Sequence, residues 1–173
     1  MNKKKREAII IILICNAILI SLLELIIPVP IPIPGVKLGL ANIITIIAIA
    51  FLDLKDVLTI VILRCLVVGV LSKGITALPF SLSGGLLSAL VMWLVYKKTA
   101  GLFSVKGISI IGAITHNAAQ LIVASVILRE TVVLYYLPIL LISAVITGLI
   151  TGTISELTVK EIKKRGILSK FIR

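Results

Sequence analysis

Long apolar stretches, separated by short breaks that contain charged residues, proline or glycine, dominate the chain. A helix needs about 20 apolar residues to cross a hydrocarbon core of about 30 Å. Six stretches approach this length, and they cover residues 8–27, 38–52, 57–71, 80–96, 108–128 and 132–154. The pattern predicts an all-α membrane protein with six transmembrane helices.

The second and third stretches are the shortest. A helical span of 15 residues, such as 38–52, covers only about 22 Å at about 1.5 Å per residue. These two spans therefore need flanking residues or a locally thinner bilayer. Only the segment from Asp53 to Asp56 separates them, so they are predicted to form an antiparallel helical hairpin.

The composition agrees with a membrane location. Hydrophobic residues make up 60% of the chain and charged residues 14%, whereas soluble domains hold about 45–50% and about 25%. Such a chain could not cover its surface with polar groups in water, so a lipid bilayer is its expected environment. Charge this sparse also argues against a nucleic-acid partner. The two cysteines, Cys15 and Cys65, lie inside apolar stretches and are too few for a disulfide-stapled secreted module.

The distribution of Lys and Arg over alternate connections predicts the orientation. With six spans, 14 of the 18 basic residues lie on one side, 3 on the other, and Arg64 lies inside the third span. Basic residues accumulate on the cytoplasmic side, so both termini are predicted to be cytoplasmic and the protein to reside in the plasma membrane. Residues 1–157 form the predicted transmembrane domain. Residues 158–173 form a basic amphipathic tail that suits an anionic leaflet or a protein partner.

Arg64 carries the largest expected free-energy cost of any residue in the predicted spans, because a charged side chain at membrane depth must be paired or hydrated. The acidic residue nearest in depth is Glu24, close to the outer end of the first span. Two alternatives are open. Arg64 pairs with Glu24, or it faces an anionic ligand or a chain of polar groups in a polar cavity.

A second polar cluster lies near the middle of the fifth span. His116 and Gln120 are four residues apart and share one face of a helix, and Asn117 lies about 100° further round. The cluster predicts either interhelical hydrogen bonds or part of a ligand or proton pathway. Asn42 in the second span is expected to belong to the same polar layer as Arg64.

The connection between the first two spans has proline at every second position from Pro28 to Pro34. Alternating prolines exclude helix and favour an extended, stiff segment. This segment either bridges the two span ends or covers an outward-facing pocket with Glu24 and Lys37 at its rim. In the fourth span, Gly84 and Gly85 lie among serines and indicate close helix packing or a non-helical segment.

The candidate ligand-binding residues are the polar groups at membrane depth and beside the proline segment: Glu24, Lys37, Asn42, Arg64, His116, Asn117 and Gln120. No catalytic set, metal site or cofactor is predicted, because the chain has one histidine and lacks a phosphate-binding loop. A prenyl diphosphate synthase needs carboxylate clusters that hold Mg²⁺ against a diphosphate. Asp53 and Asp56 cannot form two such clusters, so no catalysis by this chain alone is expected.

Several motifs occur together and in order: Leu23-Glu24 before the prolines, PGVKLGLAN at residues 34–42, Arg64, SGGLLS at residues 83–88, and His116-Asn117 with Gln120. In this combination the chain resembles the heptaprenyl diphosphate synthase component I family, also called the Gx transporter family. That family is similar to the substrate-binding S components of energy-coupling-factor (ECF) transporters.

The resemblance implies an ECF S-component-like bundle. Such a protein captures a small ligand, here anionic or cofactor-like, from the outer face for transport with a cytoplasmic coupling module. S components often carry two alanines four apart in the first span for docking, whereas here Ser21 follows Ala17. Family members are also similar to a membrane subunit of flavin- or quinone-based extracellular electron transfer, which implies a flavoprotein or quinone-linked partner. An accessory, non-catalytic subunit of a heptaprenyl diphosphate synthase is the third hypothesis.

Overall fold

The computed structural model describes residues 3–26, 39–73, 78–99 and 102–166. All secondary-structure elements within these residues are helices, and no strand occurs among them. The elements are α1 (Lys3–Ile26), α2 (Ala41–Phe51), α3 (Leu54–Val68), the π-helical turn η1 (Gly69–Lys73), α4 (Leu78–Lys98), α5 (Val105–Leu128), the 3-10 segment η3 (Thr131–Tyr136) and α6 (Leu137–Arg165). The all-α prediction is confirmed, and each predicted span overlaps one of the six α-helices.

Four helical segments are long and apolar enough to cross a membrane: Lys3–Glu24, Leu78–Lys98, Val105–Leu128 and Thr131–Arg165. The protein is therefore a membrane protein. The other two helices are short, as the sequence indicated. α2 has 11 residues, or about 16 Å of helix. The 15 residues of α3 continue directly into the 5 residues of η1. The two segments form one continuous helical rod.

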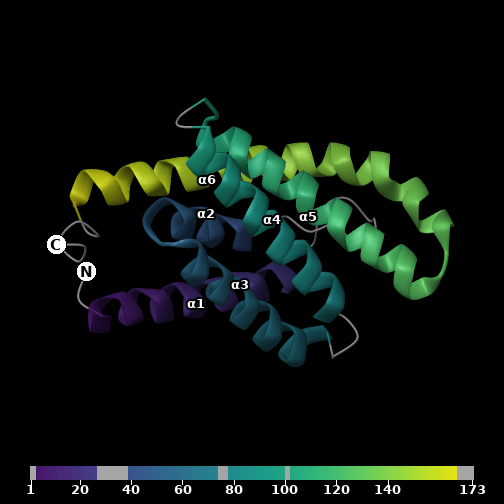
Figure 1. The fold of residues 1–173 in the computed structure, drawn as a ribbon, viewed down its shortest axis with the longest axis horizontal. Helices are drawn as coiled ribbons and strands as arrows, with labels where there is room; N and C mark the ends of the chain where they lie inside the picture. Colours follow the sequence, from purple (N-terminus) through teal and green to yellow (C-terminus); the bar gives the residue numbers. More distant parts are fainter. Residues whose placement is uncertain (1–2, 27–38, 74–77, 100–101, 167–173) are drawn as a thin grey trace.

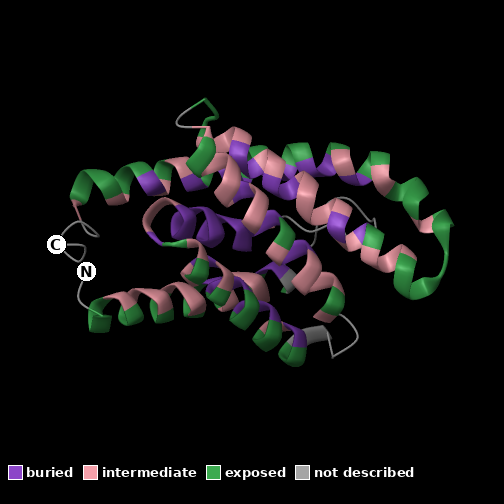
Figure 2. Cartoon of the chain, in the orientation of Figure 1, coloured by how far each residue is buried: buried purple, intermediate pink, exposed green. Residues whose placement is uncertain are grey.

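α2 is the centre of the bundle rather than a lipid-facing span (Figure 1). It contacts each of the other five α-helices. Every residue from Ala41 to Ile49 is buried, and Figure 2 shows this helix purple along its length. A helix that is apolar all round has no polar face to turn toward water, so burial on every side is the arrangement that its sequence favours. Its surroundings explain why so short a helix is stable.

The outer surface of the bundle is apolar. Large hydrophobic side chains are exposed on α1, α5 and α6, among them Ile11, Ile12, Leu19, Ile122, Val126, Ile142, Ile146 and Ile150. Figure 2 shows exposed residues along the outer sides of these helices. An exposed apolar surface of this extent in water would drive association. It is the surface expected of helices that contact lipid.

Glycines bring α5 and α6 into close contact. A Cβ added to Gly148 would lie 2.7 Å from the Cα of Ile110, and one added to Gly152 would lie 2.8 Å from the Cα of Lys106. Between them the buried hydroxyls of Ser109 and Thr151 are hydrogen-bonded at 3.0 Å. The two backbones approach as closely as they do because these positions of α6 carry no side chain.

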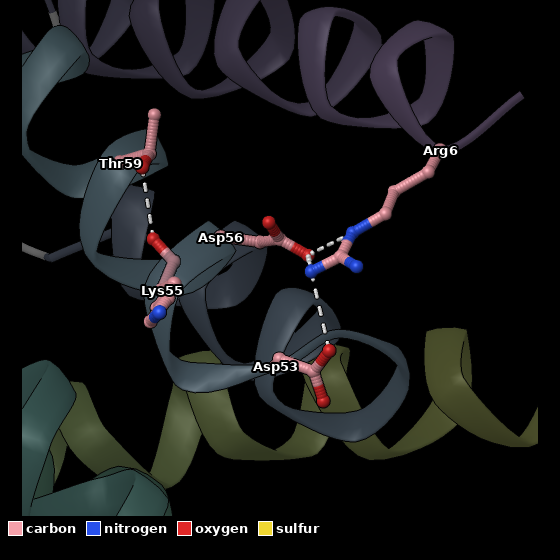
Figure 3. A network of polar contacts seen from close by, with 5 residues as sticks. All are labelled: Arg6, Asp53, Lys55, Asp56 and Thr59. Atoms are coloured by element: carbon pink, nitrogen blue, oxygen red, sulfur yellow. Dashed lines mark hydrogen bonds and ion pairs between the residues drawn. The ribbon is translucent and has the colours of Figure 1, made fainter. Parts of the chain in front are cut away.

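The start of α1, the α2–α3 turn, the start of α5 and the end of α6 share one end of the bundle, here called the basic end. Arg6 contacts Asp56, with Nε to Oδ2 at 2.8 Å, and Asp53, with Nη2 to Oδ2 at 3.2 Å (Figure 3). The hydrogen bond that Arg6 donates to Asp56, together with the negative charge of that carboxylate, raises the pKa of Arg6. Lys106 of α5 contacts Glu156 of α6 at 3.9 Å. Both described chain ends lie at this end of the bundle (Figure 1).

α6 continues past residue 158 to Arg165 without interruption. Val159 is buried and Ile162 packs against the core, whereas Lys160 and Arg165 are exposed. The apolar positions of the tail therefore contact the bundle over its described part. Residues 167–173 of the predicted tail lie outside the described residues.

Candidate functional site

Arg64 is a buried cation in the middle of the rod formed by α3 and η1. Only 7% of its surface is exposed. All seven acidic residues of the chain are among the described residues, and the ion pairs that they form there involve Arg6, Lys106, Lys160 and Arg165, not Arg64. In the described residues its guanidinium donates a hydrogen bond from Nη2 to Sγ of Cys65 at 3.7 Å. A thiol sulfur is a weak acceptor, and among the described residues Arg64 is buried without a carboxylate partner.

Glu24 is directed at the backbone before α2. It is buried, and its Oε1 accepts a hydrogen bond from the N–H of Gly39 at 2.5 Å. Gly39 has φ +67°, and its carbonyl accepts from the N–H of Asn42 at 2.8 Å. The carboxylate therefore lies at the N-terminus of α2, where a negative charge is favourable. The sequence left two alternatives for Arg64, and the first was an ion pair with Glu24. In the structure Glu24 contacts the N–H of Gly39 instead of Arg64.

Asn42 completes this group at the end of the bundle opposite the basic end. It is buried in the first turn of α2, and its Nδ2 would lie 3.4 Å from a Cβ built on Gly39. Glu24, Gly39 and Asn42 form what we call the Glu24 cluster. Lys37 and the proline segment, which were predicted to adjoin it, lie outside the described residues.

Gly85 of α4 faces Arg64. A Cβ added to Gly85 would lie 3.2 Å from Nη2 of Arg64, 3.2 Å from Sγ of Cys65 and 2.9 Å from Cγ1 of Val61. The thiol of Cys65 in turn donates to the carbonyl of Ser81 on α4 at 3.3 Å. The guanidinium therefore reaches the backbone surface of α4 at a position where that helix has no side chain.

Gly84, the preceding residue, faces α5. A Cβ added there would lie 2.8 Å from Cγ of Gln120, 3.0 Å from Cε1 of His116 and 3.1 Å from its Nδ1. Consecutive helical residues point about 100° apart, so the two glycines serve two flanks of α4. We call Gly84 and Gly85 the diglycine. It places Arg64 of α3 on one flank, and His116 and Gln120 of α5 on the other.

Asn117 faces a different helix. Its Nδ2 donates to the carbonyl of Leu140 on α6 at 3.1 Å. The predicted polar cluster of α5 is thus divided between two neighbours, because the residue next to His116 lies about 100° further round the helix. Asn117 makes a helix–helix contact, while His116 and Gln120 lie against the diglycine.

The sequence singled out Arg64, His116 and Gln120, and the structure brings each of them to the diglycine. The sequence did not assign the diglycine to this site. The Ser-Gly-Gly motif indicated close helix packing or a non-helical segment. Whether a missing Cβ admits a backbone or a functional side chain depends on the neighbouring helices. The sequence placed Cys65 inside an apolar stretch without a role at this site, and the structure buries it beside the guanidinium.

The chemistry of the diglycine site suits an anion. A guanidinium offers several N–H donors in a plane, and hydrogen bonds from a charged donor are the strong ones. An imidazole and a primary amide add further donors from α5. Within the described ranges no group of three or more His, Cys, Asp or Glu side chains could hold a metal ion.

Comparison with known proteins identifies the family. No curated protein and no solved structure matches the chain significantly. The family model described as heptaprenyl diphosphate synthase component I matches residues 13–158, which include the Glu24 cluster, Arg64, the diglycine and the polar residues of α5. The match extends over more than half of the chain, and the protein therefore belongs to the heptaprenyl diphosphate synthase component I family.

Proposed function

We propose that the protein is a membrane-embedded binding protein that captures a small anionic or cofactor-like ligand at the diglycine site for transport. The observation that carries the proposal is Arg64, a buried guanidinium without a carboxylate partner among the described residues. An isolated buried charge is strongly unfavourable, and an anion removes most of that penalty by supplying charge and acceptors together. The family match over residues 13–158 is consistent with a membrane role.

The depth of the site supports capture from the side opposite the basic end. Gly84 follows the first residue of α4 by six positions and precedes Lys98 by fourteen, which corresponds to about 9 Å and about 21 Å of helix. With the basic end in the cytoplasm, as the excess of Lys and Arg predicts, the site lies nearer the outer face of the plasma membrane. The basic end then faces a cytoplasmic coupling module of the ECF type.

The contacts of α1 bear on where such a module would dock. Ala17 is 1% exposed and packs in the core of this chain, so its side chain stabilises the bundle itself. We therefore propose that the coupling module contacts the basic end rather than the side of α1 that carries Ala17.

A binding role, rather than catalysis by this chain alone, is part of the proposal. The chain has two aspartates, Asp53 and Asp56, and both engage Arg6 in the α2–α3 turn. Carboxylates held by a guanidinium are poorly placed to coordinate the Mg²⁺ that a diphosphate reaction requires. If the chain is a synthase component, we expect it to be an accessory one.

Ligand-induced thermal stabilisation tests the proposal. The single tryptophan, Trp93, packs against the core and reports unfolding by fluorescence. Purified protein is heated with sodium phosphate, diphosphate, sulfate or flavin mononucleotide, each matched in ionic strength with sodium chloride. A ligand at 100 times its Kd stabilises by about 2.7 kcal/mol. We expect at least one anion to raise the melting temperature, and Arg64→Gln to remove the rise.

The matched control is Lys98→Gln, which removes one positive charge from an exposed position at the basic end. It should leave the response unchanged. An equal response in Arg64→Gln, or none to any anion in the wild type, would contradict the proposal. Purification from the native host would separate the partner classes, because an ATPase with its coupling subunit supports transport, and a flavin-bearing protein supports electron transfer instead.

A further inference from the structure

Two pairs of glycines in the long helices differ in what an added Cβ would meet. At Gly148 and Gly152 of α6 the nearest atoms are Cα atoms of α5, at 2.7 and 2.8 Å. At Gly84 and Gly85 of α4 all three nearest atoms are side-chain atoms. The first group allows two backbones to approach. The second keeps space for particular side chains of the neighbouring helices.

The side chains that occupy this space are mainly polar. At Gly84 they belong to His116 and Gln120, and at Gly85 to Arg64, Cys65 and Val61. Helix packing alone is usually served by apolar side chains in such positions. Here Arg64, a residue that is only 7% exposed, extends its guanidinium to within 3.2 Å of the Cβ position that Gly85 leaves empty.

We propose that Gly84 and Gly85 are positioning residues of the anion site, an inference that rests on the proposed function. Their missing side chains let Arg64 and His116 reach the same level of α4 from opposite flanks. They also leave a strip of α4 backbone without Cβ atoms between those flanks. A small oxyanion bound across this strip meets the guanidinium on one side and the imidazole and amide of α5 on the other.

Alanine substitution separates this role from ordinary packing. Inorganic diphosphate serves as the probe, and its affinity is obtained from the concentration dependence of the melting temperature. Gly84→Ala displaces the ends of His116 and Gln120, and Gly85→Ala displaces Arg64 and presses on Val61. Each is expected to weaken diphosphate binding by at least about 10-fold, the loss associated with one misplaced charge-assisted hydrogen bond. Gly107→Ala is the matched control, because its Cβ would meet the nearest atom at an ordinary 3.5 Å.

A second measurement follows the site directly. The chain has one histidine, so protein labelled with ¹⁵N-histidine has a single imidazole to observe. Diphosphate should shift the His116 resonances in the wild type and in Gly107→Ala, and should shift them less at the same concentration in Gly84→Ala. A purely structural glycine would change stability without changing this response.

A folding defect of Gly84→Ala is handled by a rescue variant. Gln120→Ala removes the Cγ that would lie 2.8 Å from the added Cβ, so the double variant should fold. Wild-type diphosphate affinity in both Gly84→Ala and Gly85→Ala, while Arg64→Gln abolishes binding, would overturn the inference. If the proposed function itself is wrong, the result is different: diphosphate fails to stabilise the wild type, or it stabilises Arg64→Gln equally.

Discussion

Arg64→Met is expected to raise the thermal stability of the ligand-free protein and to remove its response to anions. The guanidinium is buried, no carboxylate contacts it among the described residues, and its hydrogen bond there is to a thiol sulfur at 3.7 Å. Methionine is unbranched and adaptable, and it fills much of the same space without a charge. The substitution therefore removes a desolvation penalty while keeping most of the packing.

The expected size of the effect follows from the burial. Replacing buried ionic groups by apolar residues of similar volume is neutral or stabilising by about 1–4 kcal/mol. For a chain of this length, 1 kcal/mol corresponds to about 2–4 °C in melting temperature. A gain of about 2 kcal/mol thus predicts a rise of about 4–8 °C.

The assay is thermal unfolding followed by Trp93 fluorescence, in one detergent and without added anions. Lys98→Met is the control, because it makes the same kind of change at an exposed position. Ile60→Ala provides the scale for a core cavity, since Ile60 is 1% exposed. A fall in melting temperature for Arg64→Met similar to that for Ile60→Ala would refute the reasoning, because it would mean that the bundle itself satisfies the guanidinium.

Three further predictions concern stability. Gly148→Leu should lower the melting temperature strongly, because its side chain would collide with the backbone of α5 at Ile110, 2.7 Å from the Cβ position; an unchanged melting temperature would contradict the close contact. The hydrogen bond from Lys160 lowers the pKa of Glu156 below its ordinary 4.5, so this carboxylate stabilises the protein above that pH and loses its contribution as the pH falls through the lowered pKa. Glu156→Gln should flatten the decline in melting temperature between about pH 6 and pH 3, and an equally steep decline would count against the interaction. Arg6→Gln should loosen the start of α1, seen as faster amide exchange there than in wild type, with a smaller effect on melting temperature than Gly148→Leu.

The helices could be predicted from the sequence because a bilayer imposes one strong constraint. Apolar stretches between charged breaks must be long enough to cross it, and outside α6 the predicted boundaries agree with the observed ones to within five residues. The central position of α2 could not be derived this way. A short apolar helix is equally compatible with lipid contact and with complete burial, and only the packing of the other five helices decides between them.

Site residues could be predicted from the sequence where a polar or charged side chain at membrane depth carries a large free-energy cost. Arg64 stood out because charge at membrane depth needs a partner, and the polar residues of α5 stood out for the same reason. The direction of each side chain was not predictable to the same degree. His116 and Asn117 are adjacent in sequence and contact different helices, α4 and α6. The diglycine was visible as a motif, but its neighbours are set by α3 and α5, which are distant from it in sequence.

The central claim, a positive binding site at Arg64, is tested most directly at the neighbouring thiol. In a Cys15→Ser background Cys65 is the remaining cysteine, and its reaction rates with anionic and cationic methanethiosulfonates are compared. Two unit charges about 7 Å apart interact by about 2 kcal/mol at an effective dielectric constant of about 20, which is more than tenfold in rate. The account predicts that Arg64→Gln lowers the ratio of anionic to cationic rates by at least about 10-fold. An unchanged ratio, or no reaction of Cys65 with either reagent in the wild type, would contradict it.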